Sequence, residues 1–183
     1  GSEMCIRDRF KNLRFIAEDL GFPTPGVARL LYESGWPGMK VLQFAFDSRD
    51  SSSYLPHSYH NHCVCYTGTH DNSPLEMWRK EAAPKDIAYA TEYLGLSEKE
   101  GFSWGILRGG LGSVSDLFVA QMQDYLELGG EARMNFPGTQ SSDNWTWRAT
   151  KGCLNSTLAK RIYRLTELYG RLEIEKEEIN GKA

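Results

Sequence analysis

The sequence contains no long apolar run, no block of basic residues and little net charge. No stretch reaches the roughly 18 apolar residues of a membrane span, and the N-terminus lacks the apolar core of a signal peptide. The formal charge is -3 over 183 residues, whereas proteins that bind nucleic acid usually carry a basic patch. We therefore expect no nucleic acid and no membrane as partners, and a cytoplasmic location.

Cysteine is also scarce, because the whole chain has only Cys5, Cys63, Cys65 and Cys153. Their spacing forms no disulfide framework. Cys63 and Cys65 lie two positions apart on one face of a predicted strand, where two cysteines are poorly placed to bridge each other. We expect reduced thiols.

Repeats, low-complexity segments and linkers are absent as well. Residues 1–9 show no apolar periodicity and are interpreted as a leader outside the fold. Residues 173–183 are rich in charge and are predicted to be a frayed tail. The residues between them, 10–172, are predicted to form the folded part of the chain.

The sequence does contain apolar stretches that lead into carboxylates. In residues 63–67, Val64 and Tyr66 are strand formers, and Gly68 ends the strand so that Asp71 follows its C-terminal end. Open α/β sheets and (β/α)8 barrels place their chemistry at this end of their strands. Asp71 is therefore a candidate catalytic residue.

A second stretch of this kind, residues 13–17, leads into Glu18 and Asp19. An acid after a strand is often only the N-cap of the next helix. Two such acids at one edge of a sheet, however, fit glycoside chemistry, which needs one carboxyl group as proton donor and others near the anomeric carbon. We predict one site shared by Glu18 and Asp71.

Apolar strands that alternate with helical segments indicate parallel βα units and an α/β fold. The predicted strands are residues 13–17, 39–46, 63–67 and 117–121. Two helices are predicted to begin at Thr24-Pro25 and at Pro74, and three more are predicted at residues 84–94, 102–111 and 154–172. Such a sheet would leave unpaired backbone groups at an open edge. The sequence therefore indicates half of a larger domain.

Six segments form a recognisable set of motifs. They are Ile16-Ala17-Glu18-Asp19-Leu20-Gly21, Pro37-Gly38-Met39-Lys40-Val41-Leu42-Gln43-Phe44-Ala45-Phe46, Leu55-Pro56-His57, Tyr66-Thr67-Gly68-Thr69-His70-Asp71-Asn72, Ala132-Arg133-Met134-Asn135 with Pro137-Gly138, and Asn144-Trp145-Thr146-Trp147-Arg148. In order and spacing they resemble the 4-α-glucanotransferases called amylomaltase or disproportionating enzyme, of the α-amylase clan. The resemblance covers about residues 15–172 and implies the C-terminal half, β5 to β8 with helices, of a catalytic (β/α)8 TIM barrel.

The resemblance also implies roles for individual residues. Glu18 matches the general acid/base at the end of β5, and Asp71 matches the transition-state stabiliser after β7. Substrate contacts are implied for His57, His70, Asn72 and Asn135. The parent enzyme would transfer α-1,4-glucan segments between maltooligosaccharides by a retaining double displacement, with no cofactor and no metal.

One part of the family's pattern is missing from this sequence. The family's nucleophilic aspartate belongs to an Arg-x-Asp motif on β4, ahead of residue 13, and no such motif occurs in the chain. A retaining enzyme forms its glycosyl-enzyme intermediate on that nucleophile. We therefore expect the N-terminal half of the barrel in a parent chain, and no activity of the isolated chain.

Other functions stay open as alternatives. Potential zinc ligands crowd into residues 57–71, namely His57, His60, His62, Cys63, Cys65, His70 and Asp71, but their spacing matches no zinc pattern. Residues 108–113 are glycine-rich, yet no lysine follows and no strand precedes them, so phosphate binding is not indicated. A non-catalytic carbohydrate-binding module and an amylase-like hydrolase are further alternatives. Tyr54, Tyr59, Trp145 and Trp147 are candidates for sugar stacking or for ordinary packing.

Overall fold

The computed structural model of the chain describes residues 9, 13–21, 24–47 and 54–172. The chain divides into two compact units, Gly1–Trp147 and Arg148–Ala183, a division that the sequence did not indicate. Apart from Arg9, the predicted leader at residues 1–9 and the predicted tail at residues 173–183 lie outside the described residues. Those two boundaries stay predictions.

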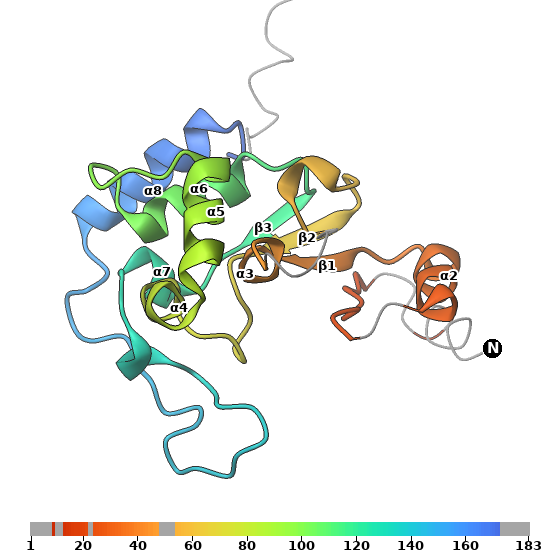
Figure 1. Cartoon of the computed structure of the whole chain (residues 1–183), viewed down its shortest axis with the longest axis horizontal. Coiled ribbons are helices and arrows are strands. Elements are labelled where there is room, and N and C mark those ends of the chain that lie inside the picture. Colours follow the sequence, from red (N-terminus) through yellow and green to blue (C-terminus); the bar gives the residue numbers. More distant parts are fainter. Residues whose placement is uncertain (1–8, 10–12, 22–23, 48–53, 173–183) are drawn as a thin grey trace, which may run out of the picture. The chain divides into compact units, whose positions relative to one another are not determined.

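A parallel sheet forms the centre of the first unit (Figure 1). Its strands are β1 (Gly38–Val41), β2 (Cys63–Tyr66) and β3 (Leu117–Val119), in the order β1-β2-β3. Gly38 of β1 pairs with Cys63, and Val64 of β2 pairs with Leu117. The predicted α/β arrangement of parallel strands and helices is confirmed, and the C-terminal ends of the strands lie at one edge of the sheet.

Helices connect the strands, and several begin where the sequence carries a capping signal. α2 (Pro25–Ser34) starts after Thr24, whose Oγ1 accepts a hydrogen bond from the Val27 N–H at 3.3 Å. The connection from β2 to β3 contains α4 (Leu75–Glu81), α5 (Pro84–Leu94) and α6 (Phe102–Leu111). α5 and α6 have the predicted bounds. Shorter elements are η1 (Pro56–Ser58), α7 (Met122–Tyr125) and η2 (Gly130–Ala132).

The hydrophobic core lies between one face of the sheet and the helices. Cys63 and Cys65 of β2 pack there with Leu75 of α4 and with Phe102 and Ile106 of α6, and all five residues are buried. Both cysteines are free thiols, as predicted. Because side chains alternate along a strand, Val64, which lies between the two cysteines, points to the opposite face of the sheet.

The predicted strand at residues 13–17 is wrong, since these residues form no strand in the structure. One backbone hydrogen bond joins them to the start of β1, from the Ala17 N–H to the Pro37 carbonyl at 2.9 Å. The Phe15 ring packs against Trp36, with ring centres 5.1 Å apart. The segment therefore runs beside the sheet without the ladder of hydrogen bonds that makes a strand.

The predicted strand at residues 39–46 is correct only in its first part. β1 is followed directly by the short helix α3 (Leu42–Ala45). Leu42, Ala45 and Phe46 have helical spacing and are fully buried, whereas Phe44 between them is 38% exposed. A continuous apolar run fits a strand and a buried helix equally well, and burial of this one helical face favours the helix.

The strand β3 is less covered than its sequence suggests. Leu117, Phe118 and Val119 are all apolar, which is typical of a strand covered on both faces, but Leu117 is 47% and Val119 is 38% exposed. Phe118, between them, packs against the core beneath the helices. The face of the sheet opposite the helices is therefore open at β3.

The second unit contains α8 (Ser156–Leu168). The helix starts after Asn155, whose Oδ1 accepts hydrogen bonds from the Thr157 and Leu158 N–H groups, each at 3.0 Å. The predicted helix at residues 154–172 is thus shorter at both ends in the structure. None of the residues of α8 is fully buried, but Leu158, Ile162 and Leu165, which share one face of the helix, are half-buried.

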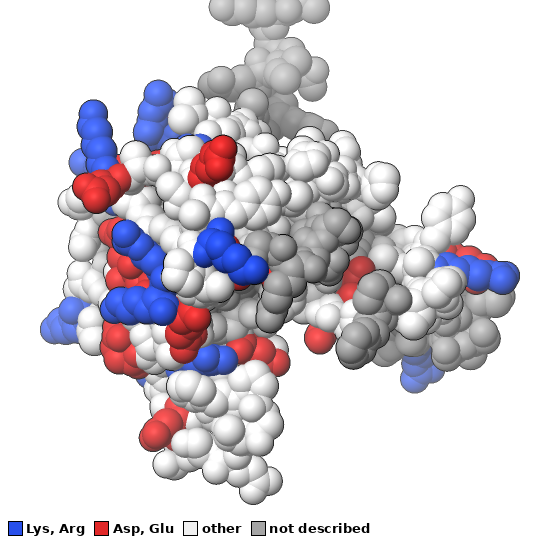
Figure 2. All heavy atoms as spheres, in the orientation of Figure 1, with Lys and Arg blue, Asp and Glu red and all other residues white. Residues whose placement is uncertain are grey.

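The described helices include none that is long and apolar enough to cross a bilayer. On the face drawn in Figure 2, acidic and basic side chains are interspersed. The cytoplasmic location stays a prediction.

Ile106 of α6 is a fully buried member of the core. We expect Ile106→Ala to lower the free energy of unfolding by about 2–5 kcal/mol, because it removes buried methyl groups and leaves a cavity. Val114→Ala, at a position that is 52% exposed, is the control and should change the free energy by less than about 0.5 kcal/mol. Urea denaturation measures both, and equal effects would contradict this description of the core.

Candidate active site

The segment from the end of β2 to the first residue of α4, residues 67–75, carries most of the predicted site and is called the site loop. Its first residue, Thr67, and its last, Leu75, are fully buried. At Gly68, a Cβ atom would lie 2.8 Å from Gln43 Nε2 and 3.0 Å from Gln121 Nε2. Any side chain there would force its neighbours to shift, which explains why glycine ends the strand pattern.

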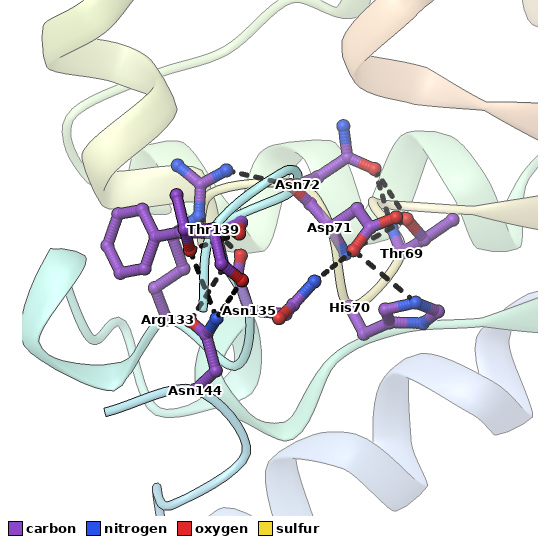
Figure 3. A network of polar contacts seen from close by, with 9 residues as sticks. Thr69, His70, Asp71, Asn72, Arg133, Asn135, Thr139 and Asn144 are labelled. Carbon is purple, nitrogen blue, oxygen red and sulfur yellow. Dashed lines mark hydrogen bonds and ion pairs between the residues drawn. The ribbon is translucent and has the colours of Figure 1, made fainter. Parts of the chain in front are cut away.

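Asp71 lies in the exposed part of the site loop, within a network of polar contacts (Figure 3). Its Oδ1 accepts a hydrogen bond from Asn135 Nδ2 at 2.6 Å and lies 3.4 Å from His70 Nε2. Its side chain is 47% exposed. Both contacts use Oδ1, so they orient the carboxylate from one side.

Arg133 links the site loop to the segment that carries Asn135. Its guanidinium donates to the Asp71 carbonyl at 2.7 Å, to Ser73 Oγ at 2.7 Å and to the Asn135 carbonyl at 2.9 Å. It also lies over the Phe136 ring, 4.5 Å from the ring centre. A planar fork of donors suits such a bridge. Arg133 therefore helps to fix the backbone of both Asp71 and Asn135, a role that the sequence motif alone did not reveal.

Glu18 reaches the same place from a different segment. Its neighbour Asp19 accepts a hydrogen bond from the Met39 N–H of β1 at 2.7 Å. Gly38 permits this approach, because a Cβ atom there would lie 2.7 Å from Asp19 Oδ2. Asp19 thus ties the segment to the sheet, while Glu18 lines a cavity together with Asp71.

That cavity has a volume of about 600 Å³ and lies at the C-terminal ends of the strands. Its lining includes Tyr66 at the end of β2 and Val119 at the end of β3. The other polar lining residues are Glu18, Thr69, His70, Asp71, Asn72 and Gln121. The structure therefore brings both predicted catalytic carboxylates together with two of the predicted substrate residues.

An aromatic ring lies beside the predicted site. His70 packs against Trp145, with ring centres 4.9 Å apart, and the indole is 53% exposed. Trp145 has φ 65°, a left-handed conformation that costs free energy for a residue other than glycine. Its N–H donates to the Met134 carbonyl at 2.7 Å, which helps to hold this backbone. Tyr59, another candidate for sugar stacking, is instead buried in the core.

Asn72 and His57 differ in their relation to the cavity. Asn72 Oδ1 accepts hydrogen bonds from the Thr69 N–H at 2.8 Å and from the Thr69 hydroxyl at 2.9 Å, so it stabilises the turn of the site loop. His57, in η1, is not part of the cavity lining, and its Nδ1 lies 2.8 Å from the Tyr93 hydroxyl. Its contact with substrate stays a prediction.

Two buried polar side chains behind the site loop were missed from the sequence. Gln43 of α3 donates from Nε2 to the Ser73 carbonyl at 2.8 Å. Asp124 of α7 accepts hydrogen bonds from Thr67 Oγ1 at 2.5 Å and from the Leu75 N–H at 2.8 Å. A lone polar residue within an apolar run was a signal for Gln43. Asp124 stands in a polar stretch and gave no signal.

Burial raises the pKa of Asp124 to about 6, against an ordinary value of 3.8. The hydrogen bonds from Thr67 and Leu75 oppose this rise, and the charge of Glu76 adds to it. Because the side chain is fully buried, desolvation outweighs the hydrogen bonds. Asp124 therefore loses its proton at a higher pH in the folded protein than in the unfolded chain.

Among the residues that the structure describes, no group of three or more His, Cys, Asp or Glu side chains is placed to hold a metal ion. Cys63 and Cys65 are buried in the core, and His62 lies 3.5 Å from Asp116. The zinc alternative thus has no support in this part of the chain. Two carboxylates around an open cavity, with amide and imidazole groups beside them, instead suit a ligand rich in hydroxyl groups.

Known proteins are similar to this chain in both sequence and fold. A family model described as 4-alpha-glucanotransferase matches residues 2–155. The 4-alpha-glucanotransferase of Clostridium butyricum is 45% identical over 169 residues, which are 92% of this chain and 34% of that protein. The 4-alpha-glucanotransferase of Synechocystis is 45% identical over 161 residues, which are 87% of this chain and 32% of that protein. The chain therefore spans about a third of the length of these relatives.

A solved structure, the amylomaltase from Streptococcus agalactiae in complex with acarbose, has the same arrangement of elements. It superimposes with a TM-score of 0.87 at 32% sequence identity, over 93% of this chain and 34% of that chain. The described structure is therefore similar in fold to about a third of that amylomaltase.

The raised pKa of Asp124 predicts how stability depends on pH. Between about pH 4 and pH 6 this group holds a proton in the folded protein but not in the unfolded chain, so its contribution to stability falls as the pH rises. The gap between a pKa of about 6 and the ordinary 3.8 corresponds to about 3 kcal/mol. The measured quantity is the free energy of unfolding of the wild type minus that of Asp124→Asn. We expect this difference to fall by up to about 3 kcal/mol from pH 4 to pH 7.

Urea denaturation at several pH values measures that difference. Asp143→Asn, at an exposed position, is the matched control, and its difference from the wild type should stay within about 0.5 kcal/mol across the range. A wild-type advantage over Asp124→Asn that grows with pH would mean that the pKa of Asp124 is lowered, and would contradict the prediction.

Proposed function

Because the chain belongs to the 4-alpha-glucanotransferase family, we propose that it is the C-terminal part of an enzyme that transfers α-1,4-glucan segments between maltooligosaccharides. The observation that carries the proposal is that Glu18 and Asp71 line the same cavity. Barrel enzymes hold their reacting groups at that end of their strands. Since the chain spans about a third of its relatives, the activity is that of the longer protein.

Glu18 acts as the general acid/base in this proposal. It gives a proton to the glycosidic oxygen as the bond breaks, and it later takes one from the hydroxyl group of the incoming sugar. Both steps require a carboxyl group that reaches the bound sugar. Glu18 is exposed and lines the cavity, and the hydrogen bond from Met39 to Asp19 keeps its backbone in place.

Asp71 stabilises the transition state in this proposal. Its carboxylate holds ring hydroxyl groups by charge-assisted hydrogen bonds, and its charge favours the oxocarbenium ion that develops as the bond breaks. This task needs a carboxylate that is already oriented before the reaction. The contacts of Oδ1 with Asn135 and His70 supply that orientation.

The double displacement needs a third carboxylate, the nucleophile, about 5 Å from the acid/base. In this proposal the nucleophile belongs to barrel strand four, residues 13–17 take the place of strand five without forming a strand in the structure, and β1, β2 and β3 are strands six to eight. The exposure of Leu117 and Val119 on the face opposite the helices supports a sheet that continues into a closed barrel. We expect the 183-residue chain alone to show no transfer.

Donors and acceptors are α-1,4-glucans and maltooligosaccharides in this proposal. The related amylomaltase from Streptococcus agalactiae was solved in complex with acarbose. Trp145, beside His70, offers an exposed aromatic face on which a glucose ring can stack. Transfer exceeds hydrolysis when such contacts hold an acceptor sugar in place before water reacts.

Product analysis after incubation of the full-length protein with maltotriose tests the proposal. A transferase yields glucose together with chains longer than maltotriose. An amylase-like hydrolase yields only glucose and maltose, and a non-catalytic binding module yields no product. Either of the last two results would overturn the proposal.

Glu18→Gln should abolish transfer in the full-length enzyme while leaving the fold intact, because an amide cannot exchange the proton. General acid/base catalysis contributes about 10²- to 10⁴-fold, so we expect the rate of maltotriose transfer to fall by at least about 10²-fold. Glu33→Gln, at an exposed position of α2, is the matched control and should keep wild-type activity. Retention of more than about 5% activity by Glu18→Gln would remove this role.

Asp71→Asn should lower kcat by several orders of magnitude, because the amide keeps the size but loses the charge that stabilises the cation. We expect maltooligosaccharides still to bind, with weaker affinity, since most contacts of the bound sugar persist. Calorimetric titration with maltotetraose measures the affinity, and Asp143→Asn is the control at an exposed position. A loss confined to affinity, with kcat unchanged, would speak for a binding role only.

A further inference from the structure

The site loop is held at both ends by one carboxylate. Asp124 Oδ2 accepts a hydrogen bond from the Thr67 hydroxyl at 2.5 Å, and Oδ1 accepts one from the Leu75 N–H at 2.8 Å. Thr67 is the first residue of the loop and Leu75 is the last, and all three residues are fully buried. Asp71 lies midway between these two anchored ends.

Asp124 is not a catalytic residue, because it does not line the cavity and is closed off from solvent. Its burial is unfavourable for the charged form, and among the residues that the structure describes the charge that acts on it is the negative one of Glu76. Glu76 of α4 adds to the raised pKa of Asp124, and the pKa of the neighbouring Tyr125 is raised first by burial and then by the charge of Asp124. An apolar side chain would fill this position without that cost. It could not, however, hold the two ends of the loop.

The residue before Asp124 connects α7 to the other half of the network. Gln123 is buried, and its Nε2 donates to the Ala132 carbonyl at 3.1 Å. Ala132 directly precedes Arg133, whose guanidinium donates to the Asp71 carbonyl. Two adjacent side chains of α7 therefore reach both the site loop and the segment that bonds to it.

We propose that Asp124 is a positioning residue for the transfer reaction, which fixes both ends of the site loop and so sets the place of the Asp71 carboxylate in the cavity. The effect of Asp124 on the transfer reaction rests on the proposed function, whereas its anchoring of the site loop does not. A stabiliser acts mainly in the transition state, so a loosened loop lowers kcat more than it raises KM. Misplacement of a reacting group by about 1 Å can cost about 10²-fold in rate.

Four variants of the full-length enzyme separate positioning from general stability. Asp124→Ala removes both hydrogen bonds. Asp124→Asn keeps an acceptor for the Leu75 N–H and offers a donor to Thr67 Oγ1. Thr67→Val removes one bond at nearly constant volume. Glu127→Gln, at an exposed position just beyond α7, is the matched control.

The kinetic readout is kcat and KM for maltotriose, at a temperature where circular dichroism shows each variant to be folded. We expect kcat of Asp124→Ala to fall about 10- to 100-fold with KM within about threefold of the wild type. Asp124→Asn should recover most of the loss, and Glu127→Gln should equal the wild type. If folded Asp124→Ala keeps kcat within twofold, the proposal is overturned. If Asp124→Ala does not fold, Thr67→Val decides, with a fall in kcat of at least threefold expected.

Hydrogen exchange provides a readout that needs no catalysis. The Asp71 N–H donates to Thr69 Oγ1 and the Asn72 N–H to the Thr69 carbonyl, so both report on the site loop. In folded Asp124→Ala or Thr67→Val we expect their exchange to speed up at least tenfold, with the amides of α6 unchanged. Equal acceleration in α6 would show a purely structural role and overturn the proposal. If the wild type shows no transfer, the proposed function fails while this readout still tests the anchoring of the loop.

Discussion

The burial of the Asp124 carboxylate between sheet and helices is the constraint on which the core and the site both depend. Removing a carboxylate from water is costly, and hydrogen bonds from Thr67 and Leu75 offset part of that cost. These bonds join the end of β2 to the start of α4. Leu75 is at the same time a fully buried core residue that packs with Ile106 of α6. The packing of the core therefore determines where the site loop begins and ends.

The site repeats one arrangement, in which a fixed group lies next to an exposed carboxylate. Asp19 is held by the Met39 N–H, and the adjacent Glu18 lines the cavity. In the same way, the Asp71 carbonyl of the site loop accepts a hydrogen bond from Arg133, while the Asp71 side chain is half exposed. Anchoring the backbone and exposing the side chain satisfies two opposed needs. The backbone must stay in place, and the carboxylate must reach a ligand through solvent.

Signals that lie within a short stretch of sequence were enough to predict several helices and one strand. α5 and α6 were predicted with the bounds they have in the structure, and β2 was predicted to within one residue. Residues 42–45 were misread because an apolar run has no period that separates a strand from a buried helix. The motifs also located the cavity through Glu18 and Asp71. Asp124 could not be predicted, because its partners lie 57 and 49 positions away in the sequence.

The two carboxylates are held to different degrees, and their proposed tasks differ in the same direction. Glu18 follows a segment joined to the sheet by one backbone hydrogen bond and by the bond from Met39 to Asp19. Asp71 lies in a loop anchored at both ends, with its own Oδ1 bound by Asn135. An acid/base changes its charge and its partner during each cycle, so it must adjust its position. A charge that stabilises a cation is most effective when nothing has to reorganise during the reaction, and the proposed stabiliser Asp71 is in the segment with more hydrogen bonds to the rest of the fold.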